Sequence, residues 1–137
     1  ILVALFQLGG VPKGATGEYF ATIAAGKMGG TASALFFKGM LCNMLVCLAV
    51  WCCTKMKTES GKLIMIFWCI YIFMACGFEH SIANMSVMAV GLLNGAGVEG
   101  VSIAGYFHNL LWVTLGNIAG GALLVAFPYY IIQKEKK

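Results

Sequence analysis

Residues 77–84 read Gly-Phe-Glu-His-Ser-Ile-Ala-Asn and lie near the middle of an apolar run that covers residues 63–93. This run is longer than the roughly 20 residues that one membrane-spanning helix needs. Glu79 and His80 fall near its centre, where an ionisable side chain is costly unless it faces protein or water. Irregular backbone at membrane depth is tolerated under the same conditions. The stretch therefore predicts a broken membrane helix whose interruption lines a polar site.

A structural interpretation of the same stretch is a buried Glu79–His80 pair that only ties neighbouring helices together. The functional interpretation is favoured, because ionisable residues inside a bilayer usually mark a pathway for a substrate, ion or proton. Both interpretations require that the two side chains face protein or water and not lipid.

The composition is that of an integral membrane protein. Of the 137 residues, 61% are hydrophobic and only 10% are charged, which is too few charges to cover a soluble domain of this size. All nine basic residues are lysines, and six of them gather at residues 55–62 and 134–137. By the positive-inside rule, the 55–61 loop and the C-terminal tail are cytoplasmic. The net charge of +4 is thus an orientation signal and does not indicate nucleic-acid binding.

No pattern of an enzyme or of a cofactor is present in the chain. The six cysteines lie within or at the edges of apolar segments, without the spacing of a zinc or iron–sulfur site. There is no phosphate-binding glycine loop and no nucleophile elbow, and the polar loops are too short for a catalytic domain. We therefore expect no enzyme activity, no cofactor and no metal.

Apolar and polar segments alternate and predict a multi-pass, all-α membrane protein with one broken helix. Gly116, Gly120 and Gly121 form a small-residue face that lets another helix approach closely, and Asn117 is expected to hydrogen-bond a neighbouring helix. The chain starts inside an apolar segment and without Met, so we expect further sequence upstream. The expected segments are the end of a membrane helix at 1–10, an outer loop with a short interfacial helix at 11–31, a membrane helix at 32–54, the broken membrane helix at 62–93, a membrane helix at 107–132 and a cytoplasmic tail at 133–137.

Three stretches of the chain resemble the formate/nitrite transporter family. Residues 77–85 resemble the family signature, residues 42–51 its fourth helix and residues 116–121 its sixth. They occur in family order within residues 32–132. Among the branches of the family, the chain is most similar to the hydrosulphide channels of anaerobic bacteria.

This resemblance implies an aquaporin-like channel of six membrane helices, built as two inverted halves, in the bacterial inner membrane. Five identical protomers assemble into a homopentamer within the lipid bilayer, and each protomer has its own pore. The chain would supply the C-terminal half, and the missing N-terminal half, with the second broken helix, would be its partner. No nucleic acid is implied as a partner.

The resemblance also implies site residues, carried over position by position. It makes Glu79 a structural residue at the helix break, expected to bond backbone amides that the break exposes. The residues implied for the pore and its mouth are His80 as the pore histidine, Asn43 and Asn84 as polar residues around it, Phe73 as the outer constriction, Val46 as the inner constriction and Lys27 as a residue of the outer vestibule.

The implied function is transport of small monovalent anions of weak acids, namely hydrosulphide and also formate or nitrite. The alternative is a neutral-solute channel of aquaporin type, in which His80 only lines the pore. A haem-binding subunit with His80 and His108 as ligands is disfavoured, because one histidine is expected near mid-membrane and the other at an edge. The residues do not distinguish among the anions, do not fix the charge state of His80 and do not show gating or coupling to protons.

Overall fold

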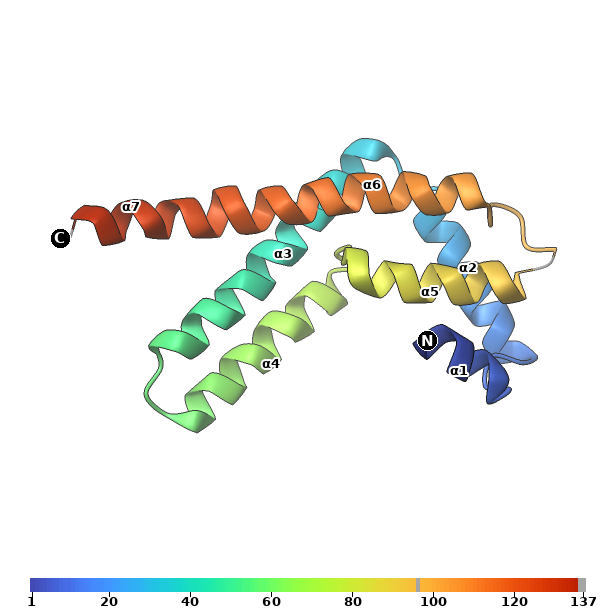
Figure 1. Ribbon diagram of the computed structural model, residues 1–137, viewed down its shortest axis with the longest axis horizontal. Coiled ribbons are helices and arrows are strands. Elements are labelled where there is room, and N and C mark those ends of the chain that lie inside the picture. The colour runs from blue at the N-terminus through green and yellow to red at the C-terminus, as the bar shows by residue number, and fades with distance from the viewer. Residues whose placement is uncertain (96, 136–137) are drawn as a thin grey trace. The chain divides into compact units, whose positions relative to one another are not determined.

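The computed structural model describes residues 1–95 and 97–135, and these residues form helices and no strands. Ala96, Lys136 and Lys137 lie outside the described residues, so the end of the expected 133–137 tail does too. The elements, shown in Figure 1, are α1 (Leu2–Leu8), α2 (Ala15–Met28), α3 (Ala32–Lys55), α4 (Glu59–Ala75), α5 (Ser81–Asn94), α6 (Ile103–Ala119), the π-helical η1 (Gly120–Ala126) and α7 (Phe127–Glu135).

The chain divides into two compact units. The first unit comprises residues 1–35 and 81–112, and the second comprises residues 36–80 and 113–137. Helices α3 and α6 each contribute residues to both units. Each unit is therefore discontinuous in sequence, so neither can be assembled from a single stretch of chain.

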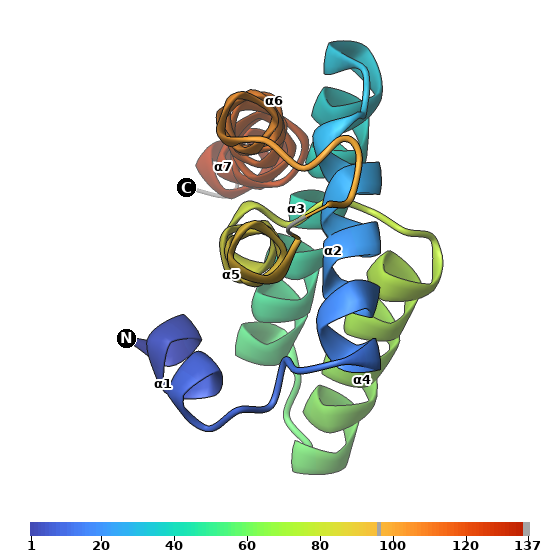
Figure 2. The same cartoon turned by 90° about the vertical axis from the view of Figure 1, so that its right-hand side faces the viewer.

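In the first unit, α2 packs across α5, which is seen end-on in Figure 2. Ala24, Met28 and Met88 are buried at the centre of this contact. Gly91 on α5 brings the two backbones together, because a Cβ atom there would clash with the Cβ of Ala24. Within a bilayer the hydrophobic effect does not drive helices together, because lipid is as apolar as their side chains. Small residues instead let the two helices approach closely and pack well. The ring of Phe6 on α1 meets Phe20 edge-on at 5.8 Å.

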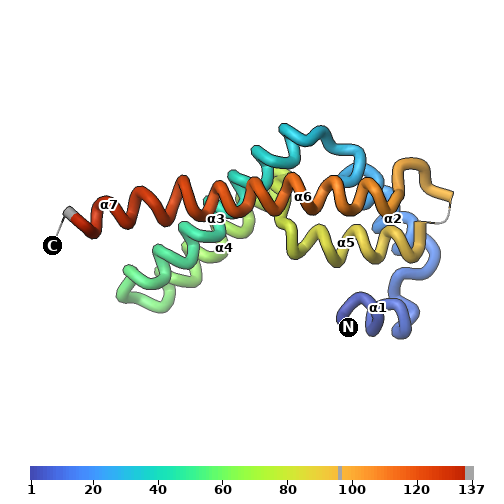
Figure 3. Tube along the Cα trace, turned by 45° about the horizontal axis from the view of Figure 1, so that its top comes forward, coloured from blue at the N-terminus to red at the C-terminus, as the bar shows by residue number. Residues whose placement is uncertain are grey.

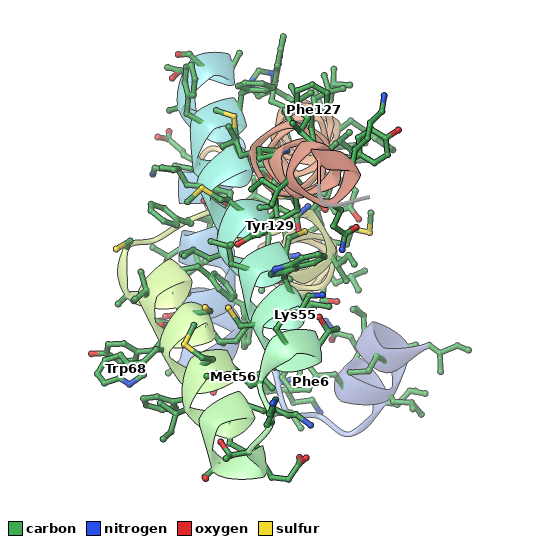
Figure 4. The ribbon with its side chains drawn as sticks, turned by 90° about the vertical axis from the view of Figure 1, so that its left-hand side faces the viewer. Phe6, Lys55, Met56, Trp68, Phe127 and Tyr129 are labelled. Carbon is green, nitrogen blue, oxygen red and sulfur yellow. The ribbon has the colours of Figure 1, made fainter. Side chains whose placement is uncertain are left out.

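In the second unit, α3 and α4 run side by side and are joined by residues 56–58 (Figure 3). At the end of α3, the rings of Trp51 and Tyr129 stack with their centroids 4.3 Å apart. The ammonium of Lys55 lies 4.8 Å from the Trp51 ring centroid; Lys55 and Tyr129 lie near one another in Figure 4. Such a cation over an aromatic ring is a favourable arrangement where one end of the pair meets water.

The glycine face predicted on the last helix packs against α3 in the second unit. A Cβ atom on Gly116 would clash with the carbonyl oxygen of Phe36, and one on Gly120 would clash with that of Met40. Gly39 of α3 faces the carbonyl of Val113 in the same way. The prediction that these glycines let a helix approach closely is therefore confirmed.

Within the described part of the chain, two helices are long and apolar enough to cross a membrane, and they cover residues 32–55 and 103–134. On α4, large apolar side chains remain exposed, among them Trp68, which points outward in Figure 4. An apolar surface of this extent is typical of a protein that faces lipid or another subunit. Where the membrane begins and ends along these helices stays a prediction.

Several helix limits differ from those that the sequence suggests. Helix α4 begins at Glu59, before residue 62, and the connection is residues 56–58, not the whole of 55–61. Thr58 is extended at the N-cap, and the Glu59 carboxylate favours a helix start, while Lys62 binds Glu59 at 2.7 Å within the first turns. Helix α6 likewise begins at Ile103, before residue 107.

Candidate functional site

A glycine turn ends α4 and creates the break at residues 76–80. The N–H of Phe78 donates to the carbonyl of Phe73 at 3.0 Å, and the N–H of Gly77 donates to Met74 at 3.1 Å. Gly77 has a φ of +64°, which a residue with a side chain adopts only at a cost. This is a Schellman motif, which satisfies helix-end carbonyls and redirects the chain. Helix α5 then starts at Ser81, so Asn84 lies inside α5 and not in the break.

The backbone of Glu79 is bound on both sides although it is not helical. Its N–H donates to the carbonyl of Lys38 on α3 at 3.4 Å, and its carbonyl accepts from Asn117 Nδ2 at 3.0 Å. Asn117 also donates to Gly39 at 2.8 Å and accepts at its backbone carbonyl from Asn43 Nδ2 at 2.6 Å. Asn117 therefore bonds neighbouring segments as expected, and it helps hold the break against α3. Such pairing removes the cost of irregular buried backbone.

His80 follows directly and is half-buried. Its Nδ1 atom is buried and has no hydrogen-bond partner in the part of the chain that the structure describes. The ring lies beside Phe73, with 6.2 Å between ring centroids and an angle of 47° between ring planes. A buried polar atom without a partner calls for a ligand, a water or a further segment of protein. The structure thus brings the predicted pore histidine next to one of the two predicted apolar constrictions.

Val46 lies one helical turn beyond Asn43 on α3 and is half-buried. It lines a mostly apolar groove of about 510 Å³ that α3 and α4 form in the second unit. The groove contains one charged residue, Lys62, which is held by Glu59. The full set of lining residues is Val46, Ala49, Val50, Cys53, Thr54, Lys62, Ile66 and Ile70.

Asn84 and Lys27 belong to the first unit, where Asn109 connects them. Asn84 is 1% exposed, and its Nδ2 donates to Asn109 Oδ1 at 2.9 Å. Asn109 Nδ2 donates in turn to the backbone carbonyl of Lys27 at 2.8 Å. Reasoning from the sequence missed Asn109, although an asparagine within an apolar helix, directly after His108, was a signal for it. His108 itself contacts the carbonyl of Gly30 through Nε2 at 3.1 Å.

The two units divide the predicted site residues between them. The first holds Lys27 and Asn84, and the second holds Asn43, Val46, Phe73, Glu79 and His80. Among the described residues, no group of three or more histidine, cysteine, aspartate or glutamate side chains could hold a metal ion. All six cysteines are free thiols.

The chain is similar to known transporters over most of its length. A family model described as formate/nitrite transporter matches residues 1–131. The nitrite transporter NirC of Escherichia coli K12 is 47% identical over 110 residues, which cover 80% of this chain and 40% of NirC. The probable formate transporter of Methanothermobacter thermautotrophicus is 44% identical over 117 residues, which cover 82% of this chain and 41% of that protein. The chain thus spans about two fifths of the length of these relatives.

Solved structures of channels are also similar to this chain. An ion channel of the FNT family superposes with a TM-score of 0.84 at 37% identity, covering 95% of this chain and 52% of that one. A pentameric formate channel with formate bound superposes with a TM-score of 0.86 at 26% identity, covering 96% of this chain and 59% of that one. The glycine-terminated helix break, the helix-packing glycines and these matches together show that the chain belongs to the formate/nitrite transporter family.

Proposed function

We propose that the chain forms part of a membrane channel for small monovalent anions of weak acids, with His80 in the pore. The main support is the buried Nδ1 of His80, which has no hydrogen-bond partner within residues 1–95 and 97–135 and directly follows a break that Gly77 creates. The names of the relatives point to nitrite and formate as permeants. Hydrosulphide, which the sequence resemblance suggests, is part of the same proposal, because it too is the small anion of a weak acid.

The imidazole supplies what such an anion needs at the centre of the pore. In general, histidine is the side chain that gains or loses a proton near neutral pH. His80 can therefore donate a hydrogen bond to the anion or pass it a proton. Helix α5 starts one residue later in the sequence, and the N–H groups of a helix N-terminus favour negative charge.

Phe73 and Val46 act in this proposal as apolar constrictions. A narrow apolar passage excludes hydrated ions, because it offers no replacement for their water. The contact between the rings of Phe73 and His80 supports a pathway in which proton transfer occurs beside a constriction. An anion that gains a proton there crosses the apolar passage as a neutral acid.

The assembly is part of the proposal as well. We expect a homopentamer in the bacterial inner membrane, by analogy with the pentameric formate channel. An aquaporin-like pair of inverted halves would be completed by sequence that the relatives have outside the matched stretch. The 55–61 segment and the C-terminal tail are placed on the cytoplasmic side by their lysines.

Flux measurements with the complete protein in proteoliposomes test this function. The panel is nitrite, formate, hydrosulphide and chloride at several pH values. We expect flux of the weak-acid anions to exceed that of chloride and to rise, relative to protein-free vesicles, as the pH falls. Passage of water or a neutral solute without any weak-acid anion would instead favour the aquaporin-type function. The order of the fluxes of the three anions decides whether the chain belongs with the hydrosulphide channels of the family.

A charge change at the expected vestibule gives a second test. Lys27→Ser is expected to reduce flux a few-fold at low ionic strength and to have little effect at high salt, because a salt solution of 0.1 M screens charges beyond about 10 Å. Lys27→Arg, which keeps the charge, is the matched control and should conduct like the parent. A loss of flux that is the same at every salt concentration would argue against attraction of anions by Lys27.

A further inference from the structure

Asn109 is the most completely enclosed polar residue of the first unit. It lies on α6 with 0% of its surface exposed, and both ends of its amide are used. Its Oδ1 accepts from Asn84 on α5 at 2.9 Å, and its Nδ2 donates to the carbonyl of Lys27 on α2 at 2.8 Å. One side chain therefore joins three helices.

The orientation of the Asn84 and Asn109 amides follows from the backbone carbonyl of Lys27, which accepts the last hydrogen bond. The oxygen and nitrogen of an asparagine amide look alike, so their assignment must come from their partners. A backbone carbonyl can only accept, so Asn109 must turn its NH₂ group toward Lys27. Its oxygen then faces α5, and Asn84 must turn its own NH₂ group toward Asn109. The carbonyl of Lys27 thus determines which atom Asn84 directs at its neighbour.

The bond to Lys27 also holds the end of α2. The last four carbonyls of a helix have no partner within the helix, and residue 27 is the last but one in α2. Asn109 supplies the missing donor there. The contact of His108 Nε2 with Gly30 at 3.1 Å ties the following residues to α6 as well.

We propose that Asn109 is a positioning residue for anion selectivity, acting through Asn84, whose amide it orients. This inference rests on the proposed function and on the sequence resemblance, which implies that Asn84 is one of the polar residues around the pore histidine. A pore asparagine discriminates among anions by the direction of its amide, since donors attract an anion and the carbonyl oxygen repels it. A residue that sets this direction alters selectivity without touching the permeant.

The experiment measures the ratio of nitrite flux to formate flux for the complete protein in proteoliposomes. Asn109→Leu removes the donor and the acceptor and keeps a side chain that branches at the same atom. We expect the ratio to change about fivefold, the size expected when one orienting hydrogen bond is lost. Combined with Asn84→Leu, which removes the group being oriented, Asn109→Leu should change the ratio no further. A merely structural role would lower the amount of assembled protein. The ratio of nitrite flux to formate flux through the protein that does assemble would then be unchanged.

Asn94→Leu is the matched control. Asn94 lies on the same helix as Asn84, but its Nδ2 donates to Val90 of its own helix at 2.8 Å, so the ratio should stay at the parental value. If Asn109→Leu does not assemble, Asn109→Ser replaces it, because the smaller hydroxyl cannot reach both partners. Parental ratios in the assembled variants, or a full additional change in the Asn84→Leu background, would overturn the inference. Absence of flux of either anion through the parent would overturn the proposed function, and the inference with it.

Discussion

Replacing His80 with leucine is expected to lower anion flux through the complete protein about a hundredfold, as for other sites that lose one oriented donor. The imidazole Nδ1 is buried and has no partner among the described residues, so it is available to a permeating anion. Leucine fills a similar volume and offers neither a hydrogen bond nor a proton. Flux in proteoliposomes, normalised to assembled protein, measures the effect.

His80→Asn separates the two roles that the imidazole can have. Asparagine donates a hydrogen bond but transfers no proton near neutral pH. Partial flux, with a changed dependence on pH, would assign proton transfer to His80. His108→Gln, which keeps a donor toward Gly30, is the control and should retain the parental pH profile. If both His80 variants conducted like the parent at every pH, the histidine would have no role in conduction.

Gly120→Ala is expected to lower the stability of the folded protein. A Cβ atom at this position would clash with the backbone carbonyl of Met40 on α3, and backbone cannot move aside as a flexible side chain can. Overpacking of this kind costs about 1–3 kcal/mol. The expected result is a lower melting temperature in detergent and less assembled protein on size-exclusion chromatography.

Gly26→Ala is the matched control for the same change. Gly26 lies within α2, and a Cβ atom there would meet nothing within 4 Å. Because alanine is the better helix former by about 1 kcal/mol, the melting temperature should be unchanged or slightly higher. Equal stability of Gly120→Ala and the parent would mean that α3 and η1 can move apart without cost.

Local features of the fold could be predicted from the sequence. The apolar composition indicated an all-helical membrane protein, and the residues around Gly77 pointed to a break within residues 63–93. The structure shows how that glycine acts: its left-handed conformation and the hydrogen bonds of Gly77 and Phe78 involve residues within one helical turn or so. Interactions over such a short distance can be recognised in a sequence. The glycine face at residues 116–121 was predictable for the same reason, because its spacing repeats along one helix.

The family and most of the proposed site residues could also be predicted, because these residues lie in stretches of the sequence that resemble motifs of the family. The roles of His80, Phe73, Val46 and Lys27 in transport nevertheless stay predictions. Helix α5 starts at Ser81, so Asn84, the last residue of the 77–84 stretch, lies inside a helix and not in the break. Helix starts depend on which backbone groups find partners, and a run of apolar residues does not reveal that.

The sequence by itself determined the class of the protein, its family and the position of the interrupted helix. Only the tertiary structure showed that Asn117 holds the backbone of Glu79 and that Asn109 joins Asn84 to the end of α2. The physical reason is that an asparagine amide can bond any acceptor or donor within reach. Its partner is decided by the rotation and register of whole helices, which many weak packing contacts set together and no short motif encodes.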